Sequence, residues 1–214
     1  SYKQNFLPAK VDFATCLLEG KGSIAKDIDK GLKLLKQAVD EGSPMAASNL
    51  ALIYQKAYYD QPQNLDEALR LHRIAEKEGS ATSMVELGKA YFRGKFGTID
   101  FEEDHIRAAR LFERAAEKYD PEGLYSWAVF ELNGYGGTAI DINSAVTDLK
   151  TAADMGFSQA MFKLYQLYNE GINGVKDVTT AIMYLNMACD RNNKNALSVR
   201  DSIGSTKSVK KDPS

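Results

Sequence analysis

The side chains with the most evident chemical potential stand together in the stretch Asp100–Phe112, which reads DFEEDHIRAARLF. Four carboxylates and one imidazole fall between Asp100 and His105. Carboxylate oxygens are preferred ligands of hard cations such as Ca²⁺, and a histidine beside acids can transfer protons. The stretch could therefore bind a cation or serve acid–base chemistry. The alternative is a solvated loop whose acids face the positive end of the following helix.

No other pattern in the sequence indicates catalysis. The sequence contains no G-x-S-x-G, C-x-x-C or Walker motif. His72 is the only other histidine, so a zinc site with two histidines would require a chance approach. The two cysteines, Cys16 and Cys189, lie too far apart in the sequence to indicate a disulfide framework. We predict a protein that is not an enzyme and that carries no metal or cofactor.

Charge and hydropathy limit the kinds of partner. The 214 residues include 27 basic and 29 acidic side chains, so no basic excess favours nucleic acid. No apolar run approaches the roughly 18 residues that span a membrane, and the opening SYKQNFLPAK does not resemble a signal peptide. We expect a soluble protein, cytoplasmic or, after removal of a signal, periplasmic or secreted. The oligomeric state stays open.

One segment of the chain occurs five times. The copies begin with Asp or Asn, which suit the first cap of a helix, and carry small residues at the fifth and twelfth positions. Glycine or asparagine ends four of them, as at left-handed helix ends. The pattern predicts a helix of about four turns. The copies start at Asp27, Asn64, Asp104, Asp141 and Asp177, with spacings of 37, 40, 37 and 36 residues.

A second repeated segment precedes each of these copies. It opens on a small residue, has a large apolar residue four positions later, and carries a tyrosine four positions further on in three copies. This spacing is helical. The chain is therefore predicted to be all-α, with five helix pairs in tandem. The opening residues are Ala9, Ala46, Ser83, Gly123 and Ala160.

The combined pattern, A-x-x-x-L-G-x-x-Y-x-x-G followed by D-x-x-x-A-x-x-x-x-x-x-A-A-x-x-G, resembles the Sel1-like repeat family, relatives of tetratricopeptide repeats. The resemblance implies a right-handed superhelix (solenoid) with a concave groove that serves as a protein-binding scaffold. Ala57, Glu131 and Asp148 depart from the pattern. We expect a single repeat domain over residues 1–204, with repeats at 9–42, 46–79, 83–119, 123–156 and 160–192, a C-terminal cap at 193–204 and a disordered tail at 205–214.

The repeat alignment gives the opening acids a simpler interpretation. Asp104 is the helix-capping residue of the third copy, and His105 occupies a position held elsewhere by Ile28, Leu65, Ile142 and Val178. The remaining acids belong to a loop lengthened in this copy alone. We favour a solvated, capped loop, while a bound cation or a partner contact stays open.

The concave groove is the predicted binding site for a protein or peptide partner. By analogy with tetratricopeptide units, one face of each first helix should line it, with its aromatic residues as anchors and its cations pairing with acids. The alternative is that several of these side chains pack inside the repeats. The predicted residues are Lys56, Val85, Lys89, Phe92, Arg93, Tyr125, Val129, Leu132, Phe162 and Gln166.

The function predicted from the sequence is that of a non-enzymatic scaffold or adaptor. Two other functions would use the same groove. One is an immunity or inhibitor protein that blocks a specific enzyme or effector. The other is a glycan-binding module whose aromatic residues stack on sugars.

Overall fold

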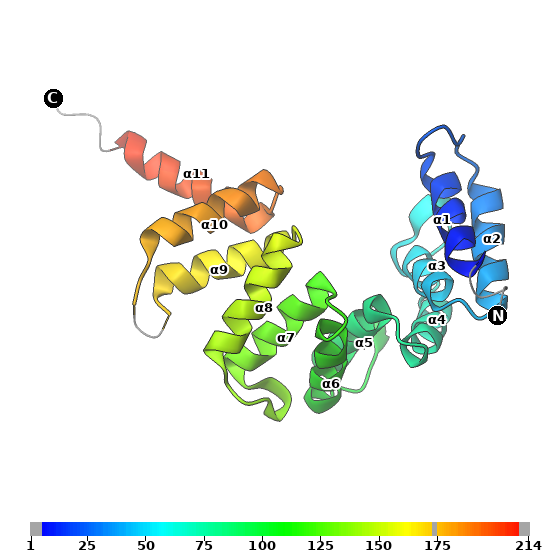
Figure 1. The fold of residues 1–214 in the computed structure, drawn as a ribbon, viewed down its shortest axis with the longest axis horizontal. Coiled ribbons are helices and arrows are strands. Elements are labelled where there is room, and N and C mark those ends of the chain that lie inside the picture. The colour runs from blue at the N-terminus through cyan, green and yellow to red at the C-terminus, as the bar shows by residue number, and fades with distance from the viewer. Residues whose placement is uncertain (1–5, 173–174, 210–214) are drawn as a thin grey trace. The chain divides into compact units, whose positions relative to one another are not determined.

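The structure is a computed structural model that describes residues 6–172 and 175–209. Their elements are helices, apart from one short antiparallel hairpin, which confirms the predicted all-α fold. In chain order (Figure 1) they are α1 (Phe6–Glu19), α2 (Ile28–Asp40), α3 (Pro44–Lys56), the 3-10 helix η1 (Tyr58–Asp60), α4 (Leu65–Lys77), α5 (Ala81–Arg93), β1 (Lys95–Phe96), β2 (Ile99–Asp100), α6 (His105–Ala116), α7 (Pro121–Asn133), the 3-10 helix η2 (Tyr135–Gly137), α8 (Ile142–Asp154), α9 (Ser158–Glu170), α10 (Val178–Asp190) and α11 (Lys194–Val209).

Each predicted repeat is present as two consecutive helices. The odd-numbered helices α1 to α9 are the first helices, and the even-numbered helices α2 to α10 are the second helices. Every second helix is capped by the predicted Asp or Asn, whose side-chain oxygen accepts a hydrogen bond from a backbone N–H at 2.9–3.0 Å. Each cap stabilises its helix by about 1 kcal/mol. The capping and donor residues are Asp27 and Lys30, Asn64 and Glu67, Asp104 and Arg107, Asp141 and Ser144, and Asp177 and Thr180.

The capping residues also tie each second helix to its first helix. The backbone N–H of every capping residue donates to a carbonyl in the last turns of the preceding first helix, with N–O distances of 2.9–3.3 Å. This bond fixes the far end of the connecting loop, so the loop can change in length without changing the helix pair. The accepting carbonyls belong to Leu17, Tyr54, Tyr91, Glu131 and Tyr168.

The chain divides into two compact units, Ser1–Ala115 and Ala116–Ser214. Each unit has its own apolar core, for example around Leu35 and Leu50 in the first and around Leu149 and Leu164 in the second. The small residues at the twelfth position of the second helices are all fully buried, which is why larger side chains do not occur there. These residues are Ala38, Ala75, Ala115, Ala152 and Ala188.

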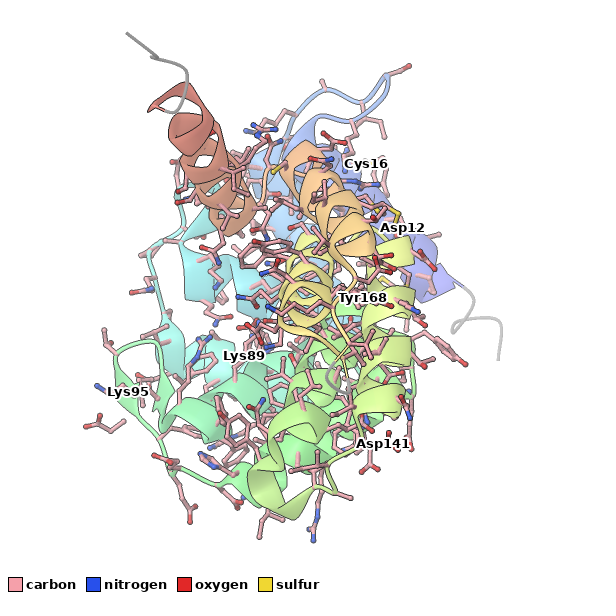
Figure 2. The ribbon with its side chains drawn as sticks, turned by 90° about the vertical axis from the view of Figure 1, so that its left-hand side faces the viewer. Asp12, Cys16, Lys89, Lys95, Asp141 and Tyr168 are labelled. Carbon is pink, nitrogen blue, oxygen red and sulfur yellow. The ribbon has the colours of Figure 1, made fainter. Side chains whose placement is uncertain are left out.

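The lengthened loop of the third copy is a β-hairpin, which the sequence analysis did not predict. β1 and β2 pair antiparallel, with Phe96 opposite Ile99. Phe96 is 2 % exposed and packs in a small cluster with Ala68 of α4 and Ala90 of α5. Lys95, beside it, points away from the helices (Figure 2). The additional residues of this copy therefore cover the second helix of the preceding repeat.

The last helix, α11, begins at Lys194 as a helix of the first type and runs to Val209. It continues past residue 204, where we expected the cap to end and a disordered tail to begin. No proline interrupts residues 205–209, so nothing in the covalent structure stops the helix there. The rest of the predicted tail, 210–214, lies outside the described residues.

The sixteenth residue of each second-helix copy, two or three residues past the helix end, adopts a left-handed backbone, as the repeated Gly or Asn predicts. Four of the five positions hold Gly42, Gly79, Gly156 or Asn192, but the third holds Tyr119 with a φ of 55°. This conformation is unfavourable for a side chain with a Cβ. We therefore expect Tyr119→Gly to raise the free energy of unfolding by about 0.5–1 kcal/mol.

Urea unfolding at neutral pH measures this gain. Tyr119 is 68 % exposed, so removal of its ring forfeits little packing. The matched control is Tyr119→Ala, which removes the ring and keeps the Cβ. The interpretation is wrong if alanine and glycine change the unfolding free energy equally.

Candidate functional site

Two acids of the stretch Asp100–Phe112, Glu103 and Asp104, have structural partners. Asp104 caps α6, and His105 places its Nε2 atom 3.0 Å from Glu103 Oε1 and its ring 4.9 Å from the ring of Phe92. Asp100, Glu102 and Glu103 are exposed to solvent. Over residues 6–172 and 175–209, no three His, Cys, Asp or Glu side chains stand close enough to share a metal ion. The described geometry therefore points to capping and ring contact at this loop.

The predicted groove residues of the first unit lie on α3 and α5 and differ in exposure. Lys56 and Arg93 are exposed at the ends of their helices. Lys89 is half-buried and donates to Glu86 at 2.7 Å, and half-buried Phe92 contacts His105. Val85 is only 1 % exposed, so it belongs to the core of the unit and not to a surface that a partner can reach.

The predicted groove residues of the second unit lie on α7 and α9. Tyr125, Val129 and Leu132 follow the helical spacing of one face of α7, and Phe162 and Gln166 follow it on α9. All five are half-buried. The ring of Tyr125 lies 5.5 Å from that of Phe157, and the ring of Phe162 lies 5.6 Å from that of Tyr165. These faces thus carry aromatic rings that the core supports from one side and leaves accessible on the other.

Burial also affects the Tyr125 phenol. Burial, and to a smaller extent the charge of Glu122, raises the pKa of Tyr125, so the hydroxyl stays protonated at neutral pH. A protonated phenol on a half-buried ring can donate a hydrogen bond while the ring contributes apolar contact.

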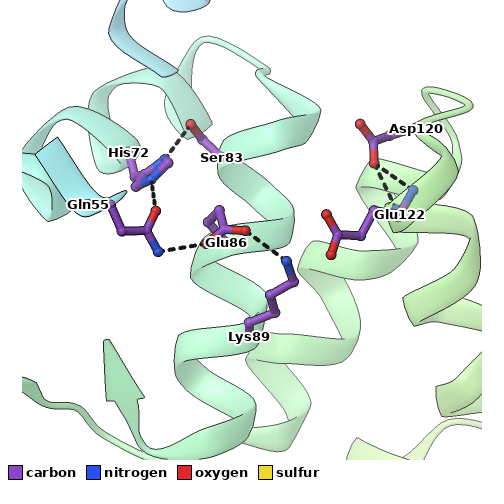
Figure 3. A network of polar contacts seen from close by, with 8 residues as sticks. Gln55, His72, Ser83, Glu86, Lys89, Asp120 and Glu122 are labelled. Carbon is purple, nitrogen blue, oxygen red and sulfur yellow. Dashed lines mark hydrogen bonds and ion pairs between the residues drawn. The ribbon is translucent and has the colours of Figure 1, made fainter. Parts of the chain in front are cut away.

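A buried polar network in the first unit was missed by the sequence analysis (Figure 3). His72 of α4 is fully buried, at a repeat position held in the other copies by Leu35, Phe112, Leu149 and Leu185. Its Nδ1 lies 2.9 Å from Ser83 Oγ and its Nε2 lies 3.2 Å from Gln55 Oε1. The Gln55 amide donates to Glu86 at 2.8 Å. The network links α3, α4 and α5 through side chains.

The partners of His72 determine which nitrogen carries the proton. Burial lowers the pKa of His72 to about 4, so the ring is neutral at physiological pH. Gln55 Oε1 is an acceptor, hence Nε2 carries the hydrogen and Nδ1 accepts from the Ser83 hydroxyl. One feature of the sequence could have indicated the network. His72 stands at a repeat position that is apolar in the other four copies.

Glu86 ends this network near the surface. Burial raises the pKa of Glu86, but the charge of Lys89 and hydrogen bonds from Lys89 and Gln55 outweigh it and keep that pKa below its usual value. The carboxylate is therefore ionised at neutral pH. The three hydrogen bonds among His72, Ser83, Gln55 and Glu86 each join two helices, so the network ties α3, α4 and α5 together.

Comparison with known families agrees with this geometry. The model of the Sel1 repeat matches residues 14–43, 44–80, 81–120 and 158–193. The pair α7 and α8 lies outside these stretches, although it is capped like the others. Its departures are Glu131, which is buried, and Asp148, which is half-buried with a pKa that burial raises. In this copy the two acids stand in place of the tyrosine and of a large apolar residue of the pattern.

Relatives share the repeats over different extents. Chitin synthase regulatory factor 3 from Schizosaccharomyces pombe is 32% identical over 94 residues, which are 44% of this chain and 10% of that protein. The chain thus spans about a tenth of the length of this relative.

Solved structures share the fold. The crystal structure of a Sel1 repeat protein from Oxalobacter formigenes superposes with a TM-score of 0.73 at 25% identity, covering 92% of this chain and 78% of that one. Immunity protein Pa5087 from Pseudomonas aeruginosa has a TM-score of 0.57 at 16% identity, covering 89% of this chain and 67% of its own, and shows a likeness of fold alone.

Among the described helices, none combines the length and the apolar character needed to cross a membrane. The four matched repeats cover more than half of the sequence and coincide with capped helix pairs. The chain therefore belongs to the Sel1 repeat family.

Proposed function

We propose that this chain is a protein-interaction module that binds a peptide or protein partner on the exposed face of its first helices. Proteins built from Sel1 repeats are typically non-enzymatic scaffolds for protein interactions. The observation that carries the proposal is the row of half-buried aromatic and aliphatic side chains on α7 and α9.

The second unit supplies the apolar anchors. Tyr125 and Phe162 occupy the same position in successive repeats, and each is supported by a neighbouring ring, Phe157 or Tyr165. Rings already held in place lose little conformational entropy on binding, and Tyr is among the residues that dominate interface energies. Val129 and Leu132 extend the apolar face along α7.

The first unit supplies exposed cations. Lys56 and Arg93 stand at the C-terminal ends of α3 and α5, where they complement the negative ends of the helix dipoles. Exposed cations contribute more to partner choice and association rate than to affinity. The proposal therefore assigns affinity to the aromatic face and selectivity to these charges.

Affinity capture from the native host, followed by mass spectrometry, tests the proposal. We expect Tyr125→Ala combined with Phe162→Ala to abolish capture of the partners bound by the wild type, because hot-spot truncations typically cost about 2 kcal/mol or more each. Circular dichroism should show unchanged helicity.

The matched control removes the same number of rings elsewhere. Tyr58 and Tyr119 are 53 % and 68 % exposed and lie off the proposed face, so Tyr58→Ala with Tyr119→Ala should capture normally. Undiminished capture by the Tyr125 and Phe162 variant would refute the proposal. A single partner bound in a tight one-to-one complex would indicate an inhibitor or immunity function, and several weaker partners an adaptor.

A further inference from the structure

The first unit contains a basic pocket on its second helices, separate from the face assigned above. The pocket has a volume of about 410 Å³ and is lined by residues of α4, α5 and α6. Its cations come from α4 and α6, and its apolar floor is formed by Leu87, Tyr91 and Leu111. The cations are Arg73, Lys77, Arg107, Arg110 and Arg114.

Helical spacing brings these cations to one place. Arg73 and Lys77 are four residues apart on α4, and Arg107, Arg110 and Arg114 follow i, i+3 and i+7 on α6. Residues with these spacings share one face of a helix. Because Leu87 and Tyr91 are likewise four apart on α5, the three helices present one basic rim above one apolar floor.

The pocket has a strong excess of positive charge. Glu76 is its single carboxylate, and it pairs with Arg114. The guanidinium of Arg107 lies 4.8 Å from the Tyr91 ring centroid and that of Arg73 lies 5.9 Å from the Phe101 centroid. Within the described parts of the chain, Arg73, Lys77, Arg107 and Arg110 have no ion pair with a carboxylate. Four cations thus converge without a counter-charge, in a chain whose net charge is −2.

Not every repeat carries two cations at the positions of Arg107 and Arg110, although the first copy has Lys30 and Lys33 there. The positions of Arg107 and Arg110 hold Ser144 and Thr147 in the fourth copy, and Thr180 and Met183 in the fifth. The repeat fold therefore does not require arginine there, because capped second helices form without it. Uncompensated like charges repel one another, so their convergence indicates an anionic ligand.

We propose that this pocket binds an acidic segment of a protein partner, with carboxylates on the arginines and an apolar side chain on the floor of Leu87, Tyr91 and Leu111. Guanidinium groups match carboxylates in charge and in bidentate geometry, and Arg114 already pairs with a carboxylate, that of Glu76, within the pocket. Nucleic acid would require a basic stripe that follows its phosphate backbone. The pocket is compact instead, which favours a short peptide segment.

Fluorescence anisotropy with a labelled synthetic peptide of glutamates flanking a leucine tests the proposal. Binding should weaken as salt rises, since exposed charges are screened. Arg107→Glu with Arg110→Glu should weaken binding about tenfold or more, because two attractive contacts become repulsive. Glutamate is a good helix former, and an acid at position 107 also suits the first turn of α6, so this variant is expected to keep its helicity.

The chain provides a matched control in its first repeat. Lys30 and Lys33 occupy the same two positions on α2, so Lys30→Glu with Lys33→Glu makes an identical change in net charge. This control should bind the peptide within about twofold of the wild type, as expected for rim charges far from a site. If both double variants lost the same peptide affinity, the loss would follow from net charge alone and the proposal would be overturned.

Four further arms make the test decisive. A peptide with glutamine in place of glutamate should fail to bind, and equal binding overturns the proposal. Tighter binding of a single-stranded oligonucleotide than of the acidic peptide at the same salt also overturns it. Arg107→Lys with Arg110→Lys, which keeps the charge and removes the forked geometry, should give an intermediate affinity. The Tyr125 and Phe162 variant should bind the acidic peptide normally, so each of the two proposals can fail alone.

Discussion

Replacing Phe96 by alanine is expected to lower the free energy of unfolding of the first unit by about 3–5 kcal/mol, the usual cost of a buried phenylalanine truncation. Phe96 is 2 % exposed and fills the space between Ala68 and Ala90, which are too small to close over a cavity. Its ring also lies 5.9 Å from that of His72 in an edge-to-face contact. The substitution therefore removes the anchor of the hairpin and one wall of the buried polar network.

Urea unfolding combined with hydrogen exchange locates this effect. Amide protons of α4 and of the hairpin should exchange faster in Phe96→Ala, while those of α8 to α10 keep their wild-type rates, because those helices have a core of their own. Thr98→Ala, at the exposed hairpin turn, is the matched control and should change stability by less than about 0.5 kcal/mol. A loss below about 1 kcal/mol for Phe96→Ala would show that the hairpin is only loosely attached.

The sequence predicted the helix pairs because every copy carries the same local signals. Asp104 is read correctly as a cap only when it is aligned with Asp27 and Asp141, and in the structure all five caps form. Local signals of this kind act within one or two helical turns, so periodicity and capping chemistry suffice to locate them.

Features unique to one copy could not be predicted by alignment with the others. The hairpin had a local signal, since Gly97 and Thr98 form a two-residue turn between Phe96 and Ile99, but this turn is not part of the repeat pattern. Its packing on α4 depends on the fold: a Cβ on Gly97 would come within 2.7 Å of the Leu65 side chain. A close approach between segments this far apart in sequence is set by tertiary structure.

The exposure of the predicted groove residues likewise could not be predicted by aligning the copies. Val85 in the third copy and Tyr125 in the fourth occupy the same repeat position. Tyr125 is half-buried, whereas Val85 is buried. Equivalent positions in successive copies therefore differ in exposure, because loop lengths and neighbouring side chains differ. The basic pocket was missed for a related reason, since its cations come from two repeats and no single copy contains them.

The buried histidine leads to the second large prediction, a loss of stability in mild acid. His72 has an ordinary pKa of 6.5, and burial lowers it to about 4 in the folded chain. The unfolded chain therefore takes up a proton first as the pH falls. The contribution of neutral His72 is fully present above pH 6.5 and is lost as the pH falls from 6.5 toward 4. Between about pH 7.5 and about pH 4.5 we expect the first unit to lose about 2–3 kcal/mol from this residue.

Comparison with His72→Gln isolates this contribution. Glutamine keeps a donor and an acceptor for Gln55 and Ser83 but does not titrate. Between about pH 7.5 and about pH 4.5 the variant should therefore lose about 2–3 kcal/mol less stability than the wild type. Glu67 and Glu86 have lowered pKa values and also lose stability in acid, but they are present in both proteins and cancel in the difference. Urea unfolding of both proteins across this pH range is the measurement. If the two stability curves run parallel, His72 titrates normally and is not held neutral by burial.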